Sequence, residues 1–180
     1  MQRRSAIALL GLLAFVAAAC GGDSDDDSAD TTPATEAAAE AGGDGSGAAA
    51  PAAGALQVTE VRFENSSATI TNTGDEPVNL NGLFMCNRPT YVPLPDQTLA
   101  PGETLDVGLA GMTPDGGEFA IYTSQNFSSA DDIISYVHWG PGGGRADTAI
   151  EAGVWSGDPA TAGPDGLTLT GDPGSAGGWG

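Results

Sequence analysis

The sequence predicts an all-β domain over residues 56–180, and three observations lead to that fold class. Short runs that alternate apolar and polar residues are interrupted by Gly, Pro, Asn or Asp about every eight to twelve residues, as in a sandwich or a barrel. No stretch of this region has a sustained helical period. Its 125 residues suit one domain with one hydrophobic core.

The first predicted strand begins at Leu56 and carries an irregularity. Its apolar residues occupy even-numbered positions up to Val58 and odd-numbered positions from Val61 onward. Because alternate side chains of a strand point to opposite faces, this strand needs a bulge or a change of sheet near Glu60. Residues 68–71 are the second predicted strand.

Two turns and a second change of parity follow. Residues 72–75 predict a turn in which Asn72 and Gly74 adopt positive φ angles. Apolar residues then alternate on even positions before Gly82 and on odd positions after it, so the parity changes at this glycine. The dipeptide at 101–102, Pro-Gly, presets another turn.

The later strands are predicted from alternation and from turn residues at their ends. They are residues 104–109, 118–123 and 132–139, with residues 167–170 as the closing strand.

Several of these segments together resemble the lamin tail domain family. In that family an opening strand precedes an I-x-N-x-G turn, a V-x-L-x-G strand, an L-x-P-G-E hairpin and a later D-x-I-x-Y strand. The resemblance covers residues 56–140 and implies an immunoglobulin-like β-sandwich. The segments that carry it are Val58-Thr59-Glu60-Val61, Ala68-Thr69-Ile70-Thr71-Asn72-Thr73-Gly74, Val78-Asn79-Leu80-Asn81-Gly82-Leu83, Leu99-Ala100-Pro101-Gly102-Glu103-Thr104-Leu105 and Asp132-Ile133-Ile134-Ser135-Tyr136-Val137.

Residues 1–19 predict a signal peptide, with Arg3 and Arg4 before an apolar stretch and small residues after it. Cys20 directly follows the small residues, and this arrangement resembles the lipobox of bacterial lipoproteins. The resemblance implies that Cys20 carries lipid and that the mature chain is anchored on the outer side of a membrane, in the cell envelope or at the cell surface. A plain secretory signal is the alternative.

The segment 20–55 predicts a disordered tether after the lipidated cysteine. It is rich in Ala, Gly and Asp, contains eight acidic residues, and has too little apolar surface to offset its ordering entropy. Residues 56–180 carry sixteen acidic side chains against three arginines, a balance of −13, and the whole chain has no lysine. This charge argues against nucleic acid and anionic headgroups as partners. It leaves cations, or an unknown envelope protein or polysaccharide, as candidate partners.

Tryptophans in the glycine-rich late segment have two interpretations. Trp155 and Trp179 either cover an open end of the sandwich, which we favour, or form an exposed loop that binds sugar by stacking.

Few residues indicate catalysis or metal chemistry. His138 is the only histidine, so a histidine relay and a zinc site both lack members, although Cys86 with His138 as base remains a minor alternative. Cys86 itself is either a small buried residue or an intermolecular disulfide partner. Calcium is the one metal with a compositional argument, and its weak candidate ligands are Asp115, Glu118, Asp158 and Asp165.

We therefore predict a membrane-anchored extracytoplasmic lipoprotein whose β-sandwich domain has a non-enzymatic binding or structural role and needs no cofactor. The alternatives are an envelope enzyme or enzyme accessory that uses the late acidic loops, and a calcium-dependent adhesion module.

Overall fold

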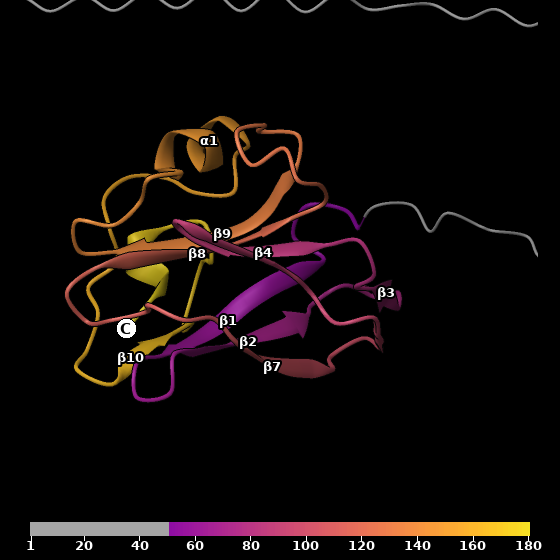
Figure 1. Cartoon of the computed structure of the whole chain (residues 1–180), viewed down its shortest axis with the longest axis horizontal. Coiled ribbons are helices and arrows are strands. Elements are labelled where there is room, and N and C mark those ends of the chain that lie inside the picture. The colour runs from indigo at the N-terminus through magenta and orange to yellow at the C-terminus, as the bar shows by residue number, and fades with distance from the viewer. Residues whose placement is uncertain (1–50) are drawn as a thin grey trace, which may run out of the picture. The chain divides into compact units, whose positions relative to one another are not determined.

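The computed structural model describes residues 51–180. The predicted signal peptide, Cys20 and residues 20–50 of the predicted tether lie outside the described residues. Within 51–180, no helix has both the length and the apolar character that crossing a membrane requires. The described chain is nearly all β, with antiparallel sheets that form two layers, and this confirms the predicted all-β class (Figure 1).

The first four-stranded sheet has the order β10-β1-β2-β7, and the second has the order β5-β4-β8-β9. The strands of the first sheet are β1 (Leu56–Arg62), β2 (Ser67–Asn72), β7 (Thr104–Gly108) and β10 (Gly166–Thr168). The strands of the second sheet are β4 (Phe84–Asn87), β5 (Thr90–Pro93), β8 (Gly117–Tyr122) and β9 (Ile133–Trp139). A third, two-stranded sheet pairs β3 (Val78–Asn79) with β6 (Thr98–Leu99). In the sequence, β3 follows β2 and β6 follows β5.

The irregularity predicted in the first strand is a β-bulge. The register between β1 and β2 shifts between Val58 and Glu60, so Val58 pairs with Ile70 while Val61 pairs with Ala68. The bulge lets apolar residues of both parities face the same core, because the extra residue restores the side-chain alternation. The parity change at Gly82 has another cause: the chain leaves β3 and enters β4 of a different sheet, and Gly82 has a φ of +82°.

The prediction for the turn after β2 needs a correction. Neither Asn72 nor Gly74 has a positive φ. Asn72 acts through its side chain instead: its Nδ2 donates to the carbonyl oxygens of Glu76 (2.8 Å) and Leu99 (2.9 Å), and its Oδ1 accepts from the Gly74 N–H (3.0 Å). A side-chain amide that replaces backbone partners can hold a turn without the left-handed conformation.

The predicted Pro-Gly turn is present. Gly102 has a φ of +77°, and the Glu103 N–H donates to the Ala100 carbonyl at 2.9 Å, which closes the turn before β7.

The hydrophobic core lies between the two sheets. The backbone N–H of Val58 in β1 donates to Oγ of Ser135 in β9 at 3.0 Å, so the sheets also share a buried hydrogen bond. The fully buried side chains that face this core include Ile70 from one sheet and Phe119 from the other.

Two short helices lie in the late segment, α1 (Ala146–Glu151) and the 3₁₀ turn η1 (Ala176–Gly178). The sequence did not predict them. Six and three residues are too few to establish a helical period.

Candidate functional site

A second buried layer covers the face of the β5-β4-β8-β9 sheet that points away from the core. Helix α1 packs on β9, on the side of the second sheet opposite to β1 (Figure 1). Trp155 packs against Tyr136 and His138, with ring centroids 5.8 Å and 5.1 Å away. We call this region the outer layer and define it by Cys86, Glu118, Tyr122, Tyr136, His138, Arg145 and Trp155.

Glu118 is the acidic group of the outer layer and is only 2% exposed. Its Oε2 accepts from the Tyr136 hydroxyl and from the backbone N–H of Arg145, both at 2.9 Å. Its Oε1 is buried and has no hydrogen-bond partner within residues 51–180. A buried carboxylate oxygen without a donor is unfavourable, so this atom marks a place where a further donor would stabilise the protein.

The outer layer holds every buried side-chain polar atom that lacks a partner in the described part of the chain. These atoms are Glu118 Oε1, Tyr122 Oη, His138 Nδ1, Arg145 Nε and Trp155 Nε1. The polar atoms that reach the inner core, by contrast, are hydrogen-bonded. Unpaired buried groups are rare in native proteins, and their concentration in one layer points to a region shaped by more than apolar packing.

Burial keeps the two candidate catalytic groups neutral. Burial, with Glu118 as a second cause, raises the pKa of the Cys86 thiol to about 12. Burial also lowers the pKa of His138. Cys86 lies on β4 and His138 on β9, and strand β8 runs between these two strands. Two strand spacings place the Cα atoms of the two residues about 10 Å or more apart. The structure therefore does not bring the two together as nucleophile and base.

Cys86 is fully buried and forms no disulfide within the described residues. Its sulfur is not on the surface where a second chain could reach it. The structure thus places it as a small buried residue, the first of the two interpretations of this cysteine.

The two candidate sugar-binding tryptophans are buried as well. Trp155 is 2% exposed and Trp179 is 5% exposed. Trp179 donates from Nε1 to the Pro173 carbonyl at 3.2 Å. This burial corrects the stacking interpretation, because neither ring offers a free face to a sugar.

The four weak calcium candidates do not form a cluster. Within residues 51–180, no three His, Cys, Asp or Glu side chains lie together in a way that could hold a metal ion. Glu118 is buried in the outer layer, while Asp165 lines a cavity beside β1 and β10. Calcium prefers six to eight oxygen ligands, which separated acids do not supply.

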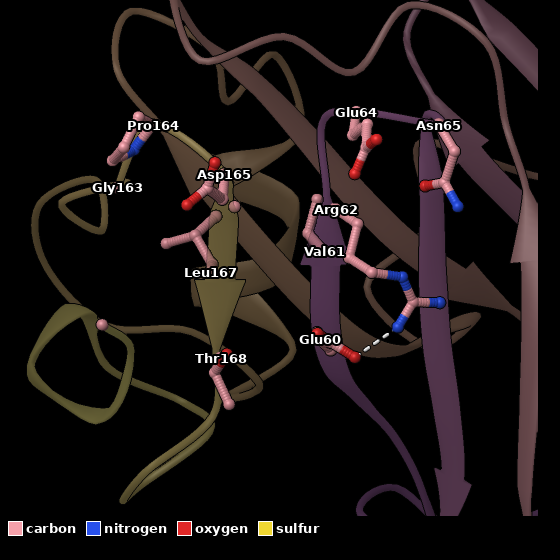
Figure 2. A pocket seen from close by; sticks show the side chains of 12 residues that line it. Glu60, Val61, Arg62, Glu64, Asn65, Gly163, Pro164, Asp165, Leu167 and Thr168 are labelled. Atoms are coloured by element: carbon pink, nitrogen blue, oxygen red, sulfur yellow. Dashed lines mark hydrogen bonds and ion pairs between the residues drawn. The ribbon is translucent and has the colours of Figure 1, made fainter.

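The cavity beside β1 and β10 has a volume of about 410 Å³ and an acidic rim (Figure 2). Glu60 and Glu64 lie on its β1 side, and Asp165 lies across from them. Arg62 forms ion pairs with Glu60 and with Asp106, the latter at 2.7 Å, so its charge is already satisfied. The rim of this cavity therefore presents acidic side chains beside the first sheet.

A second cavity, of about 280 Å³, opens next to Glu118. Arg88 and Pro89 from the β4–β5 turn form one wall, and residues 141–144 form another. The glycines of this loop are needed, because a Cβ on Gly143 would lie 2.7 Å from the His138 ring. The loop therefore packs directly on the strands.

Comparisons with known proteins add no relative to this picture: neither protein-family models, nor curated proteins, nor solved structures give a match to the chain.

Sequence reasoning gave no role to Arg145 of the outer layer or to Arg88, which lines the second cavity. Only the run of glycines before Arg145 gave a signal, since such a run permits close backbone packing. Nothing in the sequence indicated that Arg88, which is 57 positions away, would meet the same loop.

Proposed function

We propose that this protein is a lipid-anchored extracytoplasmic lipoprotein whose folded domain is a non-enzymatic binding or structural module. The observation that carries the non-enzymatic part of the proposal is the burial of the domain's only cysteine, Cys86, and only histidine, His138, with the neutral form of each favoured. A thiol with a pKa near 12 is a weak nucleophile at neutral pH.

The strand order supports an immunoglobulin-like fold of lamin-tail type as part of this proposal. Immunoglobulin domains place strands A, B and E in one sheet and C, F and G in the other, with C′ beside C in variable-type domains. The orders β1-β2-β7 and β5-β4-β8-β9 correspond to A-B-E and C′-C-F-G. The strand β10 beside β1 departs from that scheme.

The anchor rests on the sequence alone. A thioether-linked diacylglyceryl group at Cys20, with a tether to residue 55, would hold the domain near a membrane without a spanning helix. The acidic domain would then favour a basic partner or cations over the membrane surface itself.

Cell fractionation tests the anchor. The Cys20→Ala chain should carry no lipid: chain from which the signal peptide is cleaved should leave the membrane fraction as soluble protein, and the rest should accumulate unprocessed, whereas the native chain should be extracted only by detergent. Cys86→Ala is the matched control, since it removes the other thiol and should leave the protein in the membrane fraction. A Cys20→Ala chain that has lost its signal peptide and still needs detergent for extraction would contradict the lipoprotein proposal.

A further inference from the structure

Three of the four edge strands of the two large sheets are protected against a further strand. Strand β9 is buried along its whole length, and the His138 carbonyl accepts from the Ala160 N–H at 2.9 Å. Thr168 in β10 exchanges two backbone hydrogen bonds with Gly180, at 2.9 Å and 3.1 Å. Strand β5 contains Pro93, which has no N–H to offer. Natural sheets commonly protect their edges in these ways.

Strand β7 is the fourth edge, and it is open. At the two ends of its pairing with β2, the Glu103 carbonyl accepts at 3.0 Å and the Leu109 N–H donates at 2.9 Å, so odd-numbered residues turn their backbone groups to β2. Thr104, Asp106 and Gly108 therefore point their N–H and C=O groups away from β2. None of these groups has a backbone partner within residues 51–180, and β7 forms the lower border of the first sheet in Figure 1.

The side chains of β7 leave room for a further strand beside it. Thr104, Asp106 and Gly108 are exposed, and a Cβ added to Gly108 would meet no atom within 4 Å. Leu105 pairs with the fully buried Ile70 on the core side of the sheet, but Leu105 itself is only partly buried. An apolar residue of an added strand, placed opposite Leu105, would complete the burial of this side chain.

Asp106 determines which charge the edge favours. Its side chain is 69% exposed, and Arg62 and Thr69 both donate to its Oδ1, at 2.7 Å and 2.6 Å. Its Oδ2 has no hydrogen-bond partner in the described part of the chain. A lysine or arginine directly opposite Asp106 would pair with this free oxygen, in a domain that carries −13.

A second copy of this chain fits the edge poorly. If two β7 strands paired antiparallel in the register that uses all three outward residues, Asp106 would lie opposite its counterpart in the second copy. Like charges directly opposite each other destabilise a strand pair. The charge complement of this edge is therefore a strand from a different, basic protein.

We propose that β7 binds an extended segment of a basic partner protein, which adds to the first sheet as an antiparallel strand. A lysine or arginine of the segment lies opposite Asp106, and apolar residues lie opposite Leu105 and Val107. The antiparallel direction follows from its slightly greater stability per residue. This partner class deepens the binding role proposed above and rests on the domain being a binding module, but it does not depend on the lipid anchor.

Amide NMR of the full chain in detergent tests this edge, with the end-capped peptide Thr-Val-Lys-Val-Thr as probe. The amide signals of Thr104, Asp106 and Gly108 should shift most, with a Kd of about 1 mM or lower. The control peptide Thr-Val-Glu-Val-Thr should bind about tenfold more weakly or worse. Absence of shifts up to about 5 mM of the lysine peptide would overturn the proposal, and so would equal binding of the two peptides.

N-methylated peptides test the backbone hydrogen bonds directly. In the proposed register the lysine N–H of the peptide faces β7, whereas the N–H of each valine points away. Methylation of the lysine backbone nitrogen should weaken binding by about tenfold or more. Methylation of one valine nitrogen is the matched control and should change the affinity by less than about threefold. Equal effects of the two methyl groups would overturn the proposed pairing.

Variants of the edge provide a second test. Thr104→Pro removes an outward N–H and should weaken binding by about tenfold or more, while an edge strand tolerates proline where the missing N–H would face solvent. Thr104→Val keeps the N–H and should leave the affinity unchanged. Asp106→Asn should weaken binding about two- to fivefold. Full affinity in a folded Thr104→Pro chain would contradict the proposal, and the N-methylated peptides decide the matter if this variant does not fold.

The remaining outcomes separate this partner from the other possibilities. Sedimentation of the full chain in detergent should show a monomer, and a dimer that Thr104→Pro dissociates would mean that a second copy occupies the edge, which would overturn the proposed partner. A chain that stays with the membrane through Cys20 but binds no peptide refutes the partner and leaves the lipoprotein assignment intact. A chain that binds the peptide but is released from membranes refutes the anchor alone.

Discussion

The two faces of the β5-β4-β8-β9 sheet are packed by different means. Its inner face meets the β10-β1-β2-β7 sheet through apolar side chains such as Phe119 and Val137, and Ser135, which reaches across, is hydrogen-bonded. Its outer face carries Glu118, Tyr136 and other polar groups under a cover of loop and short helix. Both layers exclude water, but only the inner one is uniformly apolar.

The difference indicates separate roles for the two layers. Apolar burial is non-directional and accounts for a stable sandwich. Polar groups under a cover add little net stability and lose some where an atom has no partner. We therefore expect the inner layer to contribute more to stability than the outer layer, in which the buried ring of Trp155 should matter more than the polar groups. The predictions below test that contrast, from the largest expected effect to the smallest.

Truncation in the inner layer should have the largest effect. Phe119 is fully buried, and Phe119→Ala should lower the free energy of unfolding by about 3–5 kcal/mol through lost burial and a cavity. Denaturant titration of the full chain measures this loss. Ile150→Ala in α1, where the side chain is 48% exposed, is the control and should change the free energy by about 0.5 kcal/mol. Similar losses in both variants would contradict the assignment of Phe119 to the stabilising core of the inner layer.

Trp155 tests the cover of the outer layer. Trp155→Ala should destabilise by about 3 kcal/mol because the ring is buried against Tyr136 and His138. Trp155→Phe should lose only about 1 kcal/mol, since the indole N–H it removes has no partner in the described chain. Denaturant midpoints of the two variants give the comparison. Equal losses for Ala and Phe would mean that the indole nitrogen has a partner after all.

The pH dependence of stability should carry a contribution from the outer layer. The pKa of His138 is lowered by burial, so below about pH 6.5 the unfolded chain takes up a proton that the folded chain does not. The free energy of unfolding should therefore fall as pH decreases from 7 toward 5.5. His138→Gln should flatten the slope in that window. An unchanged slope would show that other groups cause it.

Salt should have the smallest effect, and it should be the same for both layers. Screening reduces repulsion among the surface acids of a domain with a charge of −13, so the melting temperature should rise by a few degrees between low and moderate salt. Because the repulsion lies at the surface, Phe119→Ala should show the same rise as the native chain. Scanning calorimetry at matched pH measures both. A melting temperature that falls with salt would contradict this account.

The early strands were predictable because their signals are local. The parity change between Val58 and Val61 is visible in the sequence, and it led to the bulge that the register confirms. The Pro-Gly turn at Gly102 was predictable for the same reason. At Asn72 the turn was right but its mechanism was not, because the amide's partners Glu76 and Leu99 depend on the fold.

The candidate site was mostly beyond sequence reasoning. Glu118 was noticed only as a weak calcium ligand, and its actual neighbours come from β9 and from the loop before α1. Arg88 reaches Gly144 across 56 positions. Contacts over such separations leave no periodic trace, since they depend on which sheet each strand joins.

The sequence by itself determined the all-β class, the first two strands with the bulge between Val58 and Val61, and the strong negative charge, because alternation, turn residues and composition are properties of short segments or of the whole chain. Only the tertiary structure decided that the tryptophans are buried, that Cys86 and His138 lie apart, and that Glu118 and Arg88 hold one peptide group between them. The physical reason is that burial and charge pairing depend on distances in space, and these follow from sheet order rather than from position along the chain.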